Sequence, residues 1–129
     1  MKVFISADME GITSTVTREE CLSSGRFYQA FQEQMTNEVL AACEGAIAAG
    51  AEEIVVKDAH DEAANIDIAR MPECVRLIRG WSGHPYCMVE GIDPSFNAAM
   101  FIGYHSAAGQ DGNPLSHTMS RNPFYIKIN

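Results

Sequence analysis

Three short apolar runs, each followed closely by acidic or histidine residues, constrain the fold of this chain more than any other feature. The runs are Val3–Ile5, Ile54–Val56 and Met100–Ile102. Short runs rich in β-branched or aromatic residues and bounded by polar residues or glycine are typical of buried strands. We therefore expect the first strand over residues 2–7. We expect the last of the three over residues 98–103, where small residues suit a central, buried position.

The segment between the first two runs predicts a long amphipathic helix, from about residue 24 to residue 49. Gly50 follows at the position where glycine commonly ends a helix. Two strands joined by a helix form a β-loop-α-β unit over residues 2–58, with parallel strands and a right-handed crossover. The apolar stripe of this helix recurs at spacings of three and four and comprises Phe27, Phe31, Met35, Val39, Leu40, Cys43 and Ile47.

The fold class is therefore predicted to be α/β, with a three-layer-like parallel or mixed sheet flanked by helices. In open sheets of this class, ligands bind outside the carboxyl ends of the strands, so we expect the functional site there. Beyond residue 60 the pattern is weaker. It predicts a strand over residues 75–78, a short helical piece at residues 88–89, a helix that begins at residues 93–95, and paired strands over residues 117–120 and 124–128.

The domain organisation follows from the length of the chain and from its last predicted strand. With 129 residues, the chain is expected to form a single α/β domain over residues 1–129. The final strand carries apolar residues almost to the end of the chain, and exposed edges of this kind are usually paired or covered. We therefore expect the chain to be the N-terminal part of a longer protein.

The composition excludes several classes of partner. A formal net charge of −8 and a pI near 4.8 argue against nucleic acid and against an anionic membrane surface. No apolar stretch is long enough to span a bilayer, and the N-terminus does not have the pattern of a signal peptide. The four cysteines are scattered, with no C-x-x-C pair, which favours reduced thiols and a cytoplasmic location.

Acidic and histidine side chains follow the three runs: Asp8 and Glu10 after the first, His60 after the second and His105 after the third. Residues two apart on an extended segment point the same way, so Asp8 and Glu10 can face one cation. The carboxyl ends of parallel strands meet at one edge of a sheet, which would bring all four side chains together. Carboxylates with imidazoles are ligands that suit zinc. The pattern therefore predicts a metal site.

Other side chains near these segments admit several roles. Asp58 or Asp61 could hold the second ring nitrogen of His60, as carboxylates often do behind a ligating histidine. His117 follows a Gly-containing loop and could be a general base, a further ligand or an ordinary strand histidine. His84, between a glycine and a proline, is more typical of a loop. The Gly-rich motifs of nucleotide-binding proteins are absent from the sequence, and no base near the hydroxyl residues supports a nucleophilic triad.

Taken together, five motifs resemble those of the zinc-dependent D-aminopeptidase family. They are Ser6–Gly11, Lys57–His60, Met88–Gly91, Phe101–His105 and Ser116–Met119, in the same order along the chain. The resemblance covers essentially the whole sequence, and the set of motifs is specific. It implies an α/β fold that hydrolyses short peptides with an N-terminal D-amino acid.

The resemblance also implies roles for particular residues. Asp8, Glu10, His60 and His105 would bind zinc, with Asp8 bridging two zinc ions, and His117 would be the catalytic histidine, acting as nucleophile or base. A further glutamate ligand lies beyond the last residue of this chain in the family, so one metal position is expected to be incomplete here. Family members are longer and assemble as a ring-like homodecamer around a sheltered active site. This implies a homo-oligomer that takes small peptides as substrates.

Two alternative functions agree with the same residues. A metal-dependent hydrolase of another substrate class, such as a phosphoester, would use a similar set of ligands, although only Lys57 supplies a nearby positive charge in the sequence. A non-catalytic binding or assembly domain would use the same residues structurally. Metal content distinguishes this second alternative from both hydrolases.

Overall fold

The computed structural model describes residues 1–119 and shows a four-stranded parallel sheet with strand order β3-β2-β1-β4. The α/β class is confirmed, and within the described residues the sheet is parallel rather than mixed. The strands are β1 (Lys2–Ala7), β2 (Glu53–Asp58), β3 (Val75–Ile78) and β4 (Ala98–Ile102). The helices are α1 (Arg18–Cys21) and α2 (Tyr28–Ala48), with short 3-10 turns η1 (Ile68–Arg70) and η2 (Cys87–Val89).

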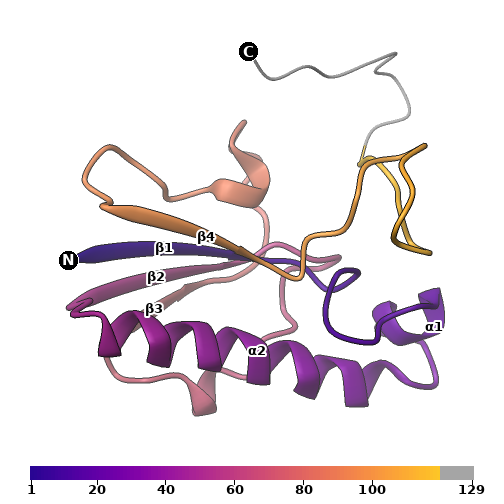
Figure 1. Ribbon diagram of the computed structural model, residues 1–129, viewed down its shortest axis with the longest axis horizontal. Coiled ribbons are helices and arrows are strands. Elements are labelled where there is room, and N and C mark those ends of the chain that lie inside the picture. The colour runs from indigo at the N-terminus through magenta and orange to yellow at the C-terminus, as the bar shows by residue number, and fades with distance from the viewer. Residues whose placement is uncertain (120–129) are drawn as a thin grey trace.

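Helix α2 runs along one face of the sheet and forms the main core with it (Figure 1). The helix contributes Met35, Val39 and Cys43, each with no exposed surface. From the sheet, Ile5 and Ile54 pack against this side. A fully buried aliphatic side chain stabilises a fold by about 1.5–3 kcal/mol. The amphipathic stripe therefore attaches the helix to the strands that carry the site.

Only the N-terminal end of α2 differs from the sequence prediction. The helix begins at Tyr28 rather than near residue 24, because a turn precedes it in which the Gly25 N–H donates to the carbonyl of Leu22 at 2.7 Å. At the other end, Gly50 has a φ of +91° and its N–H donates to the Ile47 carbonyl at 2.9 Å, as expected of a glycine that ends a helix. The predicted stripe was too wide, since Phe27 and Ile47 are 53% and 39% exposed.

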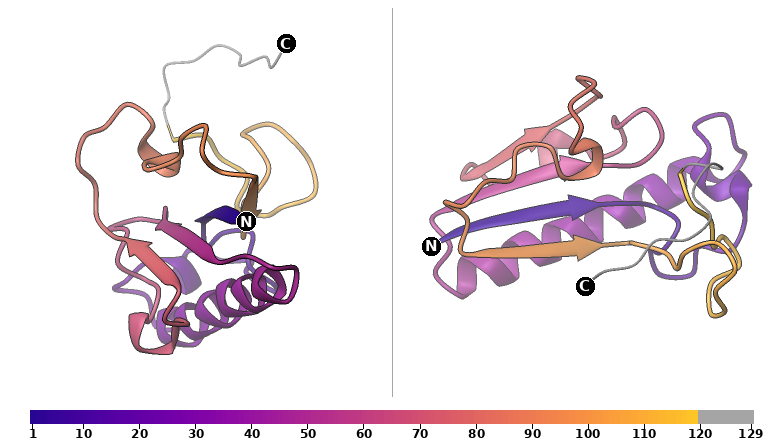
Figure 2. Two further views of the ribbon diagram at one scale, coloured as in Figure 1. Left: turned by 90° about the vertical axis from the view of Figure 1, so that its left-hand side faces the viewer. Right: turned by 90° about the horizontal axis from the view of Figure 1, so that it is seen from above.

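The opposite face of the sheet is covered by the segment that contains η2, which gives the predicted three-layer arrangement in a reduced form (Figure 2). The Ser6 hydroxyl donates to the Met88 carbonyl at 2.6 Å and so joins β1 to this segment. Phe4 packs edge-on against Phe96 on the same face, with ring centroids 5.4 Å apart. Both faces of β1 are therefore buried, which explains its continuous apolar sequence.

Three predictions for the second half of the chain were wrong. β4 is an edge strand of the described sheet rather than a central one, and Phe101 in it is 55% exposed. Residues 93–95 form a turn closed by the Asp93 side chain, which accepts from the Ser95 N–H at 2.7 Å, and no helix follows within the described residues. Residues 117–119 are irregular, and the predicted strand over residues 124–128 lies outside the described residues. None of the helices in the described part could cross a membrane, judged by length and apolar content.

Candidate metal centre

The register of the sheet aligns the carboxyl ends of three strands. Ala7, the last residue of β1, pairs with Asp58 on β2 and with Ile102 on β4. The Asp8 N–H continues the ladder by donating to the Ile102 carbonyl at 2.9 Å. The residues that follow these strands therefore emerge at one edge of the sheet. This edge also carries α1 and the loop that follows β4 (Figure 1).

Glycine allows the segments after β1 and β4 to come close together. The Gly11 N–H donates to the Gly103 carbonyl at 2.7 Å. Gly103 has a φ of +68°, and a Cβ atom there would overlap the Asp8 carbonyl and the Ile12 side chain. A Cβ atom at Gly11 would overlap the carbonyl groups of Tyr104 and Gly103. Only residues without a side chain fit both positions, and the close approach brings the residues after the two strands together.

His60 lies against both carboxylates that follow β1. Its Nδ1 atom is 3.2 Å from Oδ1 of Asp8 and 2.9 Å from Oε2 of Glu10. Its Nε2 atom is 2.8 Å from the backbone carbonyl of Cys21. Because a carbonyl oxygen only accepts, Nε2 carries the hydrogen, and Nδ1 is the nitrogen turned toward the acidic groups. The imidazole of His60 is 5% exposed, so this arrangement is shielded from water.

His105 and His117 complete the cluster from the other side. The His105 Nε2 atom is 3.6 Å from Oδ2 of Asp8, and its Nδ1 donates to the Ser106 carbonyl at 2.8 Å. The ring of His117 stacks on that of His105, with centroids 4.0 Å apart and an angle of 18° between the planes. Nδ1 of His117 donates to the Leu115 carbonyl at 2.7 Å, which leaves its Nε2 atom able to take up a proton.

The electrostatics of the cluster favour positive charge between the carboxylates. Burial opposes protonation of His60, but its contacts with Asp8 and Glu10 prevail and raise the pKa of His60 to about 10. Burial also opposes ionisation of Glu10, but contacts with His60 and Asp8 lower the pKa of Glu10 to about 2. Burial raises the pKa of Asp8, and the neighbouring charge of Glu10 adds to this effect. A cation is therefore the natural counterpart of this pair of acids.

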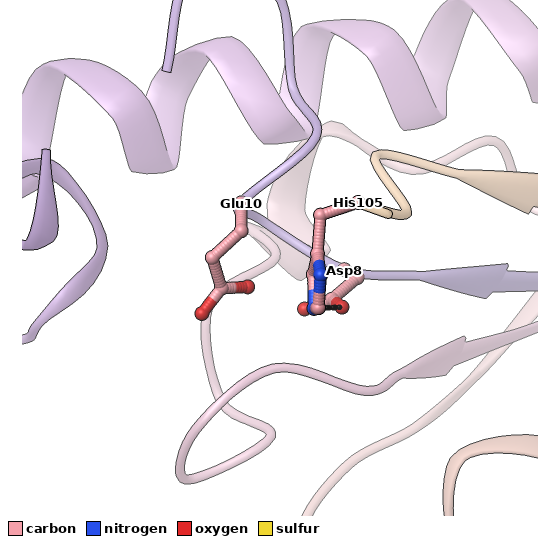
Figure 3. A group of neighbouring side chains, drawn as sticks. All are labelled: Asp8, Glu10 and His105. Carbon is pink, nitrogen blue, oxygen red and sulfur yellow. Dashed lines mark ion pairs between the residues drawn. The ribbon is translucent and has the colours of Figure 1, made fainter. Parts of the chain in front are cut away.

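The donor set fits a divalent metal ion. One ligand atom each from Asp8, Glu10 and His105 lies within 4.8 Å of the other two, and the three side chains point to the same side (Figure 3). This spread suits one ion after small side-chain rotations, or two ions about 3.5–4 Å apart. Oε2 of Glu10 is buried and accepts no well-directed hydrogen bond within residues 1–119. This oxygen contacts Nδ1 of His60 at 2.9 Å without forming a hydrogen bond, and a bound metal ion would satisfy it.

All five side chains singled out in the sequence line one cavity of about 710 Å³. They are Asp8, Glu10, His60, His105 and His117. The structure thus brings together residues from both ends of the described chain, from Asp8 to His117. His84, which the sequence suggested to be a loop residue, does not line this cavity and instead packs against Tyr86.

Two contributions to the site were not apparent in the sequence. The second ring nitrogen of His60 is held by the Cys21 carbonyl rather than by Asp58 or Asp61. Asp58 instead accepts the backbone N–H groups of the loop that follows β2. Arg18 also lines the cavity, although no feature of the sequence singled it out. Both contributions come from α1, a helix that the sequence did not predict.

The chain is similar to known D-aminopeptidases in sequence and fold. The family model described as D-aminopeptidase matches residues 1–129. A curated protein named D-aminopeptidase, from Bacillus subtilis (strain 168), is 34% identical over 119 residues, which cover 92% of this chain and 43% of that protein. The solved structure of the Zn-dependent D-aminopeptidase DppA from Bacillus subtilis, described as a self-compartmentalizing protease, superimposes with a TM-score of 0.87 at 33% identity, over 93% of this chain.

The chain spans about 43% of the length of both of these relatives. The match nevertheless includes all 129 residues, and the shared fold extends over nearly all of them. The family model and the curated relative therefore agree in one conclusion: the chain belongs to the D-aminopeptidase family.

Proposed function

We propose that this protein is a zinc-dependent aminopeptidase that hydrolyses short peptides with an N-terminal D-amino acid. The observation that carries the proposal is the cluster of Asp8, Glu10 and His105, whose ligand atoms lie within 4.8 Å of one another. Family membership supports the reaction class and the D-configuration of the substrate, and the description of the solved relative as Zn-dependent supports zinc. Carboxylate and imidazole ligands match the chemistry of that ion.

In this proposal Asp8, Glu10, His60 and His105 hold the metal, with Asp8 at the centre because it contacts both histidines. When bound, zinc activates water and polarises the carbonyl of the scissile peptide bond. Asp8 and Glu10 position the ligand set through their contacts with His60. The negative charge of the crevice also attracts the free ammonium group of the substrate.

His117 is proposed to move the proton in this reaction. Its Nδ1 hydrogen is bonded to the Leu115 carbonyl, so Nε2 is the atom available as a base. Stacking on His105 holds the ring beside the proposed metal ligands. An imidazole with this orientation can accept a proton from the attacking water and return it to the leaving amine.

The phosphoester alternative gains no support from Lys57. Lys57, the nearby cation in the sequence, directs its ammonium group to the Gly80 carbonyl and packs over the ring of Trp81, 4.3 Å from the centroid. It is fully buried and does not line the cavity. A phosphate-binding site would be expected to expose such cations to its ligand.

The decisive experiment compares D-alanyl-D-alanine with L-alanyl-L-alanine, with and without a chelator. We expect turnover of the D-dipeptide that stops when the metal is removed and returns when zinc is added. His117→Ala should abolish most of this turnover, whereas His84→Ala, outside the cavity, should retain it. Turnover that is insensitive to the chelator would exclude the metallopeptidase. A zinc-free protein that neither binds nor is stabilised by zinc would favour the non-catalytic alternative.

We further propose that the protein forms a ring-like homo-oligomer in the cytoplasm. The solved relative is described as a self-compartmentalizing protease, which supports assembly. All four cysteines are free in the structure, which agrees with a reducing compartment. Light scattering after size-exclusion chromatography tests the assembly. A monomer at micromolar concentration would contradict it.

A further inference from the structure

Arg18 places a positive charge beside an otherwise acidic crevice. It lines the cavity of about 710 Å³ that contains the metal cluster and an adjoining cavity of about 550 Å³. Glu10 and His117 also line both cavities, so the two cavities adjoin at these side chains. Among the described residues that line either cavity, no other arginine and no lysine is present.

The carboxylates next to Arg18 in the sequence are engaged elsewhere. Glu20 accepts the backbone N–H groups of Val16 and Thr17 through one oxygen, at 2.7 and 2.8 Å. Glu19 accepts the backbone N–H of Arg26 at 3.3 Å. Within residues 1–119, Arg18 makes no ion pair with any carboxylate. Its side chain is exposed, so the guanidinium group can meet a ligand.

Helix α1 links the backbone of Arg18 to the proposed metal ligands. Arg18 and Cys21 are the first and last residues of α1, three apart and therefore on one side of the helix. Cys21 is 3% exposed, and its carbonyl accepts the Nε2 hydrogen of His60 at 2.8 Å. The same short helix thus holds a proposed metal ligand at one end and presents a cation at the other.

We propose that Arg18 binds the C-terminal carboxylate of the peptide substrate and so favours peptides with a free C-terminus. This inference rests on the proposed function. A peptide has an ammonium group at one end and a carboxylate at the other, and the acids of the crevice attract the first and repel the second. A guanidinium group binds a carboxylate with two parallel hydrogen bonds.

This contact makes the free C-terminus part of substrate recognition. A peptide with a C-terminal amide has no carboxylate for Arg18 to bind. Peptides with a free C-terminus are therefore the expected substrates, and their C-terminal amides are expected to be poor ones.

The test compares D-alanyl-D-alanine with its C-terminal amide. Because hydrogen bonds to charged groups are stronger than those between neutral groups, we expect a ratio of about 10-fold or more in kcat/KM in favour of the free acid. In Arg18→Gln this ratio should fall to about one, mainly through a higher KM for the free acid, and Arg18→Lys should restore part of it. Arg26→Gln is the matched control, because Arg26 is exposed on the neighbouring turn and lines neither cavity, and it should keep the wild-type ratio.

A binding measurement on the zinc-free protein separates this inference from the proposed function. Calorimetric titration with each peptide should show that Arg18→Gln weakens binding of the free acid and leaves binding of the amide unchanged. If Arg18→Gln turns over D-alanyl-D-alanine with the wild-type ratio of acid to amide, the inference fails and the proposed function stands. If the zinc-loaded wild type hydrolyses neither peptide, the proposed function fails. Equal binding of the free acid by the wild type and Arg18→Gln would overturn the role of Arg18 in either case.

Discussion

Each of the three histidines in the crevice has one ring nitrogen fixed by a backbone carbonyl and the other turned toward the acidic cluster or the cavity. His60 presents Nδ1 in this way, whereas His105 presents Nε2. The carbonyl fixes the hydrogen of one ring nitrogen, so the other nitrogen is the one that can bind a metal ion or a proton. Asp8 is the common neighbour of His60 and His105, which makes it the residue on which the geometry of the site most depends.

Asp8→Asn is expected to lower the affinity for zinc at least about 100-fold. The variant keeps the shape of the side chain but removes the negative charge, and even the loss of a partner behind a ligand costs about 10–100-fold. Competition with a chromophoric zinc chelator measures the effect. Asp61→Asn is the control, because Asp61 is exposed and lines the same cavity without belonging to the cluster. Zinc binding by Asp8→Asn as tight as that of the wild type would remove Asp8 from the ligand set.

Among individual side chains, the sequence predicted the acidic and histidine residues of the crevice but not what holds them. Asp8 and Glu10 could be found because they follow a buried strand two positions apart. The Cys21 carbonyl that orients His60 could not, because a backbone acceptor has no signature in the side-chain pattern. Arg18 was missed for a related reason, since an exposed arginine in a polar segment is usually only a solvated charge.

Among the helices and strands, prediction and structure agreed where the hydrophobic pattern of the segment was strong. β1, β2 and α2 were predicted because each combines a clear period with a recognisable boundary. α1 was missed because four residues are too few to show a helical period. β4 was placed at the centre of the sheet because Ala98 and Ala99 suggested close packing. The strand order depends instead on contacts between distant segments, which spacing along the chain does not encode.

The loop that carries His60 depends on Asp58, at the end of β2. This buried carboxylate accepts the backbone N–H groups of Asn65 at 2.6 Å and Ile66 at 2.9 Å. Asp58→Ala would leave both groups without an acceptor, at about 1–3 kcal/mol each. We expect the free energy of unfolding to fall by about 3 kcal/mol, as measured by urea denaturation. Glu62→Ala, an exposed change in the same loop, should cost little, and an equal loss in the two variants would contradict this role for Asp58.

The crossing of the segments after β1 and β4 makes Gly103 the most restrictive glycine at the site. Gly103→Ala combines an unfavourable positive φ with overlap of the Asp8 carbonyl, which belongs to the backbone and cannot turn aside. Gly109 has a φ of +80°, but a Cβ atom there would meet open space, so Gly109→Ala isolates the cost of the backbone conformation. We expect a loss of about 1 kcal/mol for Gly109→Ala and about 3 kcal/mol or more for Gly103→Ala in urea denaturation. Equal losses would mean that the close approach is not tight.

Across the described part of the protein, one sheet forms the hydrophobic core and also positions the residues of the proposed site. α2 and the segment around η2 cover its two faces, while α1 and the loop after β4 lie at the carboxyl edge (Figure 1). At that edge Asp8 and Asp58 are buried, and Asp8 meets histidines rather than water. The core thus fixes the backbone on which a costly polar cluster can be held.

The reactivity of the four cysteines can measure the unfolding of this core, because two of them are buried within it. Cys21 and Cys43 are 3% and 0% exposed, and burial raises the pKa of Cys21 to about 12 and that of Cys43 to about 11. Only thiolates react readily with alkylating reagents, so at a pH of about 8 both should be protected in the native protein. Cys74 and Cys87 are partly exposed and should react first.

Alkylation with iodoacetamide, read by mass spectrometry across a urea series, tests this prediction. Cys21 and Cys43 should become reactive together, at the urea concentration where the far-ultraviolet circular dichroism is lost, because α1 and α2 enclose one cooperative core. A Cys74→Ser variant removes one early site and should leave the late pair unchanged. Reaction of Cys21 well before Cys43 would show that α1 opens independently of the sheet. In that case the contact between Cys21 and His60 would not be a rigid part of the site.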